Sequence, residues 1–237
     1  MSRTLTNAEV RTTAPGGRPP VRVLITAGPT HEPIDAVRFI GNRSSGRVGV
    51  ALADEGAKRG WDVTLLLGPT PRTPADSRVR VVRFRTAADL ERLLAEEAPR
   101  CDVLVMAAAV ADYRPHPGAL GATGKLRRGD GPVTLTLEPT PDLLAKAAAG
   151  RREGQLIVGF ALEPREGMLA GARAKLERKG VDLMIANPLE TMDSETIEAA
   201  AVSGDGAEVR TEGAVTKERF AAWLMAIIEG RLAGMRR

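Results

Sequence analysis

Short apolar runs alternate with helical patterns along most of the chain. The apolar runs, at residues 21–26, 62–67, 79–84, 102–107, 156–160 and 182–186, have the length of strands. The helical patterns occupy residues 46–59, 86–98, 140–149, 166–179 and 216–232. Repeated β-α units favour a parallel, doubly wound sheet with right-handed crossovers. The pattern therefore predicts the α/β class.

Local signals set several boundaries. Gly60 follows the first helix as a C-terminal stop, and residues 86–89 have the spacing of a capping box. Thr140 and Pro141 are typical of the start of the next helix. Run 102–107 is almost continuously apolar, as expected of a strand covered by helices on both faces.

The alternation breaks in the middle of the chain. Residues 108–124 form a long segment rich in Gly and Pro, and such loops tend to be functional. Residues 133–137 alternate with period two, which predicts a half-exposed strand of a flap or an interface. Segments 199–203 and 207–211 flank Gly-Asp-Gly, which is a hairpin signal. Residues 1–20 are interpreted as a disordered tail or linker stub, and 21–237 as one domain.

The start of the first helix is the strongest candidate for a binding site. Residues 42–49 read Asn-Arg-Ser-Ser-Gly-Arg-Val-Gly, after a strand that ends in a turn containing Gly28. Free N–H groups and the helix dipole favour an anion there, and glycine lets the backbone approach it. Ser44, Ser45 and Gly46, with arginines on either side, therefore predict phosphate binding.

Composition narrows the choice of ligand. Aromatic residues make up only 3% of the 237, and the net charge is +4, which suits small polyanions at least as well as nucleic acid. The single cysteine, Cys101, borders an apolar run and is interpreted as a core residue. No run approaches the ~20 apolar residues that span a bilayer, and the first 20 residues have no secretory pattern. We expect a cytoplasmic protein that binds neither membrane nor nucleic acid.

Other polar residues have two interpretations each. The basic run 125–128 suits a phosphate or a solvated turn, and Lys175 and Lys179 share one helix face, either exposed or around an anion. Asp112 follows a strand, where it could bind a ribose or Mg²⁺, or cap a turn. With no carboxylate pair or activated nucleophile evident, the set favours electrostatic handling of phosphates.

Ordered motifs lie between residues 21 and 187, namely 25–30, 32–35, 37–49, 107–115, 125–128, 141–144, 158–163 and 182–187, with Lys175 and Lys179. Together they resemble phosphopantothenate–cysteine ligase, also called phosphopantothenoylcysteine synthetase. The resemblance implies a Rossmann-like fold with a strand flap that builds a homodimer. It also implies that 4′-phosphopantothenate and L-cysteine are joined through an acyl-nucleotide, with release of pyrophosphate. The nucleoside triphosphate would be CTP, with ATP as the alternative, and Mg²⁺ would be held mainly by its phosphates.

The resemblance also assigns roles to residues. It places Asn42 at the conversion of the acyl-nucleotide, with Arg43 and Ala108 on the substrate side. It places Lys125 at the triphosphate and at the attack by cysteine. The remaining implied nucleotide positions are Gly28, Ser44, Ser45, Gly46, Asp112, Gly159, Phe160, Ala161, Lys175 and Lys179.

Some features depart from the family pattern. Arg127 and Arg128 stand where it has lysines, and 188–198 lack its usual Phe and Asn. The proline-rich start is compatible with a cut linker or a stand-alone ligase. Three alternatives stay open: an NAD(P)-dependent reductase, which would want a Gly-x-Gly-x-x-Gly turn, a nucleic-acid-binding module, and a nucleotide-binding relative without turnover.

Overall fold

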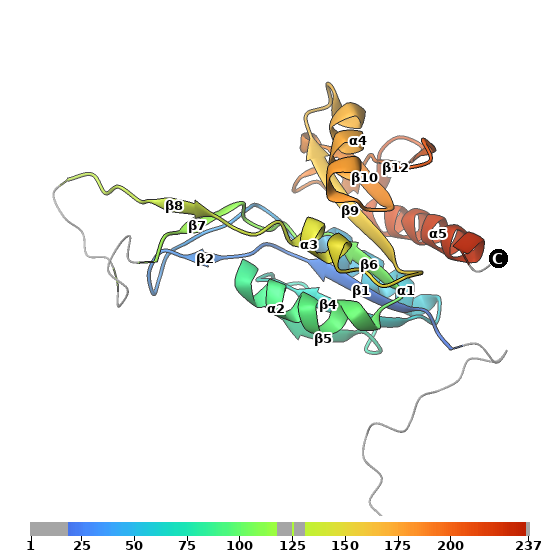
Figure 1. Ribbon diagram of the computed structural model, residues 1–237, viewed down its shortest axis with the longest axis horizontal. Coiled ribbons are helices and arrows are strands. Elements are labelled where there is room, and N and C mark those ends of the chain that lie inside the picture. The colour runs from blue at the N-terminus through green and yellow to red at the C-terminus, as the bar shows by residue number, and fades with distance from the viewer. Residues whose placement is uncertain (1–18, 118–124, 126–130, 236–237) are drawn as a thin grey trace, which may run out of the picture.

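The computed structural model describes residues 19–117, 125 and 131–235, and it is built on one eight-stranded sheet (Figure 1). Across the sheet the order is β13-β12-β10-β9-β6-β1-β4-β5. These strands are β1 (Arg22–Ala27), β4 (Asp62–Leu67), β5 (Arg80–Arg83), β6 (Val103–Met106), β9 (Leu156–Glu163), β10 (Leu183–Pro188), β12 (Ala200–Ser203) and β13 (Glu208–Arg210).

The direction of the strands confirms the predicted doubly wound sheet. From β5 to β10 every neighbouring pair is parallel, whereas β12 and β13 are antiparallel additions at one edge. The chain starts in the middle of the sheet at β1, moves to β4 and β5, and then crosses to β6 on the other side. In sheets of this kind, ligands bind outside the carboxyl ends of the strands where the order reverses, here between β1 and β6.

Apolar side chains at alternate positions along the strands fill two separate cores, one on each face of the sheet. Val23 and Ile25 of β1 pack on the face covered by α1 (Arg47–Lys58) and α5 (Lys217–Met235). Leu24 packs on the opposite face, which is covered by α2 (Ala87–Glu97), α3 (Leu143–Ala149) and α4 (Met168–Lys179). Because strand side chains point alternately to opposite faces, one apolar run supplies both cores.

An arm of short strands extends away from the sheet, to the left in Figure 1. It contains the pair β2 (Glu32–Pro33) and β3 (Phe39–Ile40), and the pair β7 (Tyr113–Pro115) and β8 (Leu137–Pro139). The prediction of a strand at 133–137 is wrong in its bounds, since β8 begins at Leu137. Beyond the last pair of β7 and β8, His116 N donates to Thr136 O at 3.0 Å.

Two helix starts also differ from the predictions. Helix α3 is capped by Asp142, whose carboxylate accepts from Ala145 N, and not by Thr140, whose hydroxyl donates to Ala111 O instead. Helix α4 begins at Met168, two residues later than predicted, because Gly167 before it adopts a left-handed conformation. The sequence patterns also missed the pair β11 (Thr196–Ile197) and β14 (Val215–Thr216) and the 3-10 helices η1 (Ala98–Arg100) and η2 (Leu189–Thr191).

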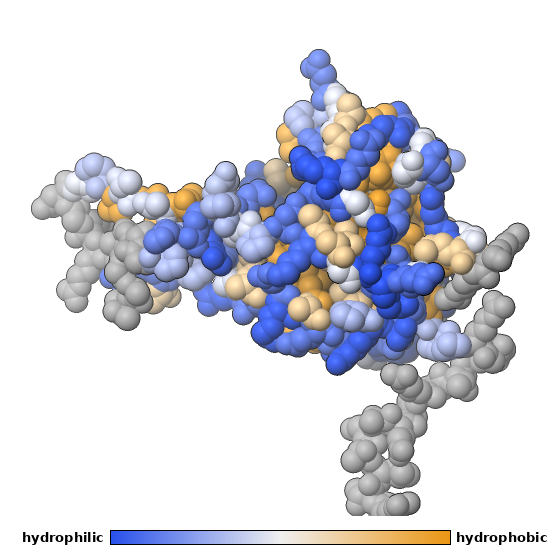
Figure 2. Space-filling view, in the orientation of Figure 1, coloured by the Kyte–Doolittle hydropathy of each residue, from blue (hydrophilic) through white to orange (hydrophobic). Residues whose placement is uncertain are grey.

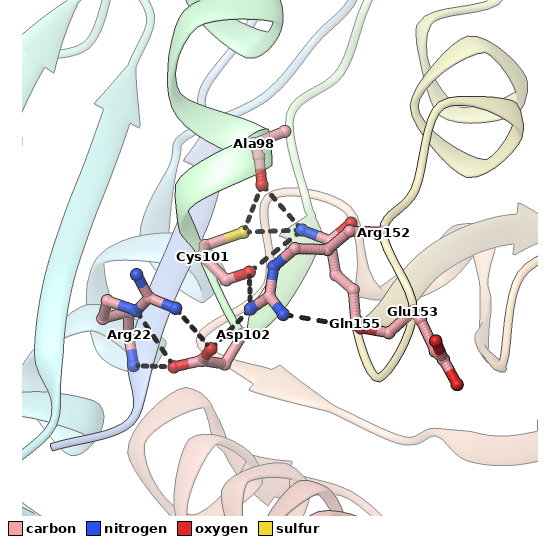
Figure 3. Close-up of polar contacts among 7 residues, drawn as sticks. All are labelled: Arg22, Ala98, Cys101, Asp102, Arg152, Glu153 and Gln155. Carbon is pink, nitrogen blue, oxygen red and sulfur yellow. Dashed lines mark hydrogen bonds and ion pairs between the residues drawn. The ribbon is translucent and has the colours of Figure 1, made fainter. Parts of the chain in front are cut away.

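Polar side chains near the amino ends of β1, β6 and β9 form a hydrogen-bonded cluster at this edge of the sheet (Figure 3). Asp102 accepts from the backbone N, Nε and Nη2 of Arg22, at 2.9, 3.2 and 2.8 Å, and from Arg152 Nη2 at 2.5 Å. Burial opposes ionisation of Asp102, but the arginines outweigh it and lower its pKa to about 2. The cluster is thus a clamp between strands that are distant in sequence.

Cys101 belongs to the same cluster, which confirms its interpretation as a core residue. Its Sγ donates to Ala98 O at 3.3 Å and accepts from Gln155 Nε2 at 3.3 Å. Burial raises the pKa of the thiol to about 11, so it is protonated and unreactive at neutral pH. Within the described residues, no helix is long and apolar enough to cross a membrane.

The clamp predicts a pH-dependent contribution to stability. Replacing Asp102→Asn should lower the free energy of unfolding at pH 7 by about 1–3 kcal/mol, because both arginines lose their charged acceptor. The folded-state pKa of Asp102 lies below its ordinary value of 3.8, so the wild-type advantage is complete above that pH and is lost as pH falls toward 2. Urea unfolding at pH 7 and pH 3 measures both effects. Glu212→Gln, at an exposed carboxylate that follows β13, is the control, and equal losses in the two variants would contradict the clamp.

Candidate active site

Hydrogen bonds fasten two loops to each other at the carboxyl ends of β1 and β6. Thr26 Oγ1 accepts from Ala108 N at 3.1 Å, and Thr30 Oγ1 accepts from Ala111 N at 3.0 Å. The side chain of Asn42 spans the same junction, with Nδ2 donating to Val110 O at 2.8 Å. The loop before α1 and the loop after β6 are thus held in register where the strand order reverses.

Helix α1 begins unusually close to β1, and glycines make this possible. A Cβ on Gly49 would lie 2.3 Å from Ala27 Cβ, and a Cβ on Gly68 would lie 2.2 Å from Pro29 O. Gly28 has a φ of +81° and packs against Gly68, while Gly46 caps α1 with a φ of +72°. The Ser44-Ser45-Gly46 turn therefore presents the start of α1 directly beside the end of β1.

A cleft of about 730 Å³ lies over these loops, as expected for the carboxyl edge of such a sheet. Its lining comes from four regions: the loop that leads into α1, the segment after β6, the start of α3, and the ends of β9, α4 and β10 with the following segment. Most of the predicted site residues line it, namely Asn42, Arg43, Ser44, Ser45, Gly46, Ala108, Asp112, Phe160, Lys175 and Lys179.

Four predicted site residues do not line the cleft. Gly28 lies beneath the turn, where its role is the close backbone packing described above. Gly159 and Ala161 are buried, and a Cβ on Gly159 would meet Leu144 at 2.7 Å. Phe160, between them on β9, points to the other face and reaches the cleft. Lys125 is exposed, and Arg127 and Arg128 lie outside the described residues.

Carboxylates accompany the basic side chains of the cleft. On α4, Lys175 pairs with Glu163 at 2.6 Å and Lys179 with Asp142 at 3.0 Å. Near α1, Arg43 pairs with Asp193 and Arg47 with Glu195. A polyanion that bridges the two groups would meet ammonium groups at one end, and guanidinium and backbone N–H donors at the other.

The sequence patterns did not assign roles to several residues that line the cleft. They are Arg47, Thr140, Asp142, Thr191, Met192, Asp193, Ser194 and Lys217. Asp142 is of a residue type that often caps helices, although the cap was predicted at Thr140 and Pro141, and Arg47 was noted only as a charge beside the turn. The segment around Thr191 and Lys217 of α5 could not be found from sequence, because tertiary packing alone brings them to the cleft.

Fold and site together define a doubly wound α/β domain with a cationic cleft at its switch point. The described residues contain no cluster of three potential metal ligands, and Cys101, the sole cysteine, is at the opposite edge of the sheet. Such a site can bind and orient phosphates and stabilise developing negative charge, without a covalent protein nucleophile.

Comparisons with known proteins agree with this class. The family model described as DNA/pantothenate metabolism flavoprotein C-terminal domain matches residues 20–231, and the chain belongs to this family. The C-terminal domain of a coenzyme A biosynthesis bifunctional protein CoaBC, a crystal structure, is 31% identical, with 90% of this chain and 96% of that chain covered and a TM-score of 0.75. The resemblance inferred from the motifs is thus confirmed.

Curated relatives are longer than this chain. The coenzyme A biosynthesis bifunctional protein CoaBC of Mycobacterium bovis is 49% identical over 70% of this chain and 41% of its own length. A protein of an unknown prokaryotic organism named cysteine/cysteine sulfinic acid decarboxylase is 43% identical over 71% of this chain and 46% of its own length. The aligned region is less than half of either relative.

The contact of α1 with β1 predicts a local effect of Gly49→Ala. The new methyl group would overlap Ala27, so the helix start must move, and we expect a loss of about 1–3 kcal/mol in the free energy of unfolding. Gly230→Ala in α5 is the matched control: nothing lies within 4 Å of its Cβ position, so it should stabilise by about 0.5–1 kcal/mol. Denaturant unfolding of the two variants measures these changes. An unchanged free energy of unfolding in Gly49→Ala would refute the packing argument.

Proposed function

We propose that this domain joins 4′-phosphopantothenate to L-cysteine in coenzyme A biosynthesis, at the expense of a nucleoside triphosphate. The carboxylate of phosphopantothenate attacks the α-phosphorus and pyrophosphate leaves, which gives an acyl-nucleotide. The amine of cysteine then attacks the acyl carbon, the nucleoside monophosphate leaves, and the amine gives up a proton. CTP is the proposed nucleotide.

One observation carries this proposal: Asn42 crosses the junction between an anion-binding helix start and the loop after β6. Its side chain lines the cleft while its Nδ2 is held by Val110 O. An amide fixed at this point is suited to orient an acyl group next to a phosphate. The family membership and the name of the CoaBC relatives, which refers to coenzyme A biosynthesis, support the same reaction.

Each side of the cleft has a proposed role. Ser44, Ser45 and Gly46 with the start of α1 bind phosphate, and Arg43 and Ala108 contact the pantothenate part. Phe160, Asp112, Lys175 and Lys179 contact the nucleotide. The lysines would bind it by exchanging their present carboxylate partners, Glu163 and Asp142, for phosphate oxygens. Lys125 is proposed to contact the triphosphate and to assist the attack by cysteine.

Mg²⁺ fits this cleft as a companion of the triphosphate. Mg²⁺ is usually held by one or two carboxylates and by substrate phosphates, and Asp112 is an exposed carboxylate in the lining. The ion would neutralise charge on the phosphates. The chain's own residues would position the two substrates and exclude water from the acyl-nucleotide.

We further propose that the arm builds a homodimer. Several large apolar side chains of the arm are exposed, among them Val37, Phe39, Tyr113, Val133 and Leu137. Figure 2 shows apolar surface on this arm, away from the body of the domain. A concentration of exposed apolar side chains on a thin projection is typical of an interface. The open edges of the short strand pairs also favour pairing with a second copy.

The ligase proposal is tested by pyrophosphate release with Mg²⁺, 4′-phosphopantothenate and L-cysteine, with CTP and ATP in parallel. Release with CTP that requires phosphopantothenate is the expected result. Absence of release with both nucleotides would refute the proposal. Release of CO₂ from cysteine under the same conditions would instead favour the activity for which the decarboxylase relative is named.

Asn42→Asp separates the two half-reactions. The variant loses the bond to Val110 O and places a negative charge next to the phosphates, so we expect amide formation to fall about 10²–10³-fold. Pyrophosphate release in the first turnover should fall much less. Quenched-flow measurement of both products checks this, with Asp62→Asn as the control. Equal loss of both steps would contradict a role in acyl transfer.

The dimer proposal predicts a change in mass. Tyr113→Glu combined with Leu137→Glu should shift the protein from dimer to monomer, since two charges cannot be buried in an apolar interface. Val209→Glu, which alters an exposed apolar side chain on β13 in the body, should leave the mass unchanged. Light scattering after size exclusion measures it, and a monomeric wild type would overturn the proposal.

A further inference from the structure

Lys217 is a buried lysine that lines the cleft at the start of α5. Only 6% of its surface is exposed, and it is the first residue of a helix of 19 residues. Its Nζ donates to Thr191 O at 3.3 Å. Within the part of the chain that the structure describes, it is the one basic residue of the cleft lining with no carboxylate within 4.0 Å.

This position is unfavourable for a cation in the absence of a ligand. Burial removes its hydration, and the first turn of a helix is the positive end of the helix dipole. Burial and the nearby charge of Arg47 lower the pKa of Lys217, while Glu195 partly opposes them. The fold therefore places the Lys217 amine where burial and the charge of Arg47 both work against its protonated form.

A hydrogen-bonded turn fixes the carbonyl that holds this lysine. Asn187 at the end of β10 donates from Nδ2 to Thr191 Oγ1 at 2.8 Å, and Thr191 Oγ1 donates to Pro188 O at 2.7 Å. Thr191 then accepts from Lys217 through its backbone oxygen. One bond of moderate length satisfies a single donor of the ammonium group, which has three.

The charges around Lys217 leave a positive excess. Arg47, in the first turn of α1, is largely buried, whereas its partner Glu195 has a side chain that is 81% exposed. Lys217, Arg47 and the positive ends of α1 and α5 thus meet Glu195, whose carboxylate is largely solvated. Such an arrangement is stabilised when a dense anion replaces the carboxylate.

We propose that Lys217 and Arg47, together with the start of α1, form a phosphoryl-binding subsite at this end of the cleft, and that Glu195 is the counter-ion a phosphoryl group displaces from Arg47. The inference rests on the proposed function and specifies where one of its phosphates is bound. The phosphoryl group can come from the triphosphate, in the part released as pyrophosphate, or from the phosphate of 4′-phosphopantothenate.

Direct binding to the full chain tests the subsite without turnover. Isothermal titration with pyrophosphate and, separately, with 4′-phosphopantothenate gives the affinity of each source. Lys217→Met keeps the apolar stem and should weaken at least one of them about tenfold or more. Arg219→Gln removes an equal charge from the same turn of α5 at an exposed position and should change affinity less than twofold.

The ligand whose binding is lost identifies the source of the phosphoryl group. Unchanged affinity for both anions in Lys217→Met would overturn the subsite, whether or not the chain proves to be a ligase. Thermal unfolding without ligand separates a structural role: an anion-binding Lys217 gives an unchanged or higher Tm on replacement by Met. A lower Tm with normal affinities would assign the residue to structure alone.

Glu195→Gln provides a second test that does not depend on a core substitution. Removing the competing carboxylate from Arg47 should tighten binding of the same anion about threefold. Glu190→Gln, at an exposed carboxylate in the same segment outside the cleft lining, is the control and should have little effect. Unchanged affinity in Glu195→Gln would contradict the displacement of Glu195.

Discussion

The whole site depends on how closely the start of α1 approaches the end of β1. Gly49 lies against Ala27 at a distance that leaves no room for another methyl group, and Gly28 and Gly68 allow the neighbouring backbones to cross. This contact brings Asn42 within reach of Val110 and places the Ser44-Ser45-Gly46 turn at the switch point. A bulkier helix start would leave the same side chains on the chain but separate them from the loop after β6.

Most basic side chains of the cleft lining are paired with carboxylates before any ligand arrives. Lys175, Lys179, Arg43 and Arg47 each have a carboxylate partner, and these partners hold long side chains in place that would otherwise sample many rotamers. A phosphate ligand exchanges one ion pair for another, so its affinity reflects the difference between them. The ion pairs of the free protein have already ordered these side chains, so a ligand does not have to order them on binding. This favours fast exchange of anions over very tight binding.

Much of the architecture could be predicted from the sequence, because it depends on local patterns. The parallel, doubly wound sheet follows from alternating strands and helices, and the phosphate turn was predicted from its small residues. The arm could not be delimited, since β2, β3, β7 and β8 are two or three residues long and have no core beneath them to impose a period. The implied roles of Gly159 and Ala161 came from their neighbour Phe160, and the alternation of a strand directs only Phe160 to the cleft. Lys217 had no sequence signal, because its burial arises only when α5 packs beside α1.

The two edges of the sheet use similar side chains for different purposes. At the amino edge, Asp102 has two arginine partners and several bonds of 2.5–3.2 Å, and the cluster is complete within the protein. At the carboxyl edge the ion pairs line an open cleft, one partner of Arg47 is almost fully solvated, and Lys217 has no carboxylate among the described residues. The presence of arginine and aspartate therefore does not distinguish a clamp from a binding site. What distinguishes them is whether the buried charge is satisfied by the chain itself, and at the carboxyl edge it is not.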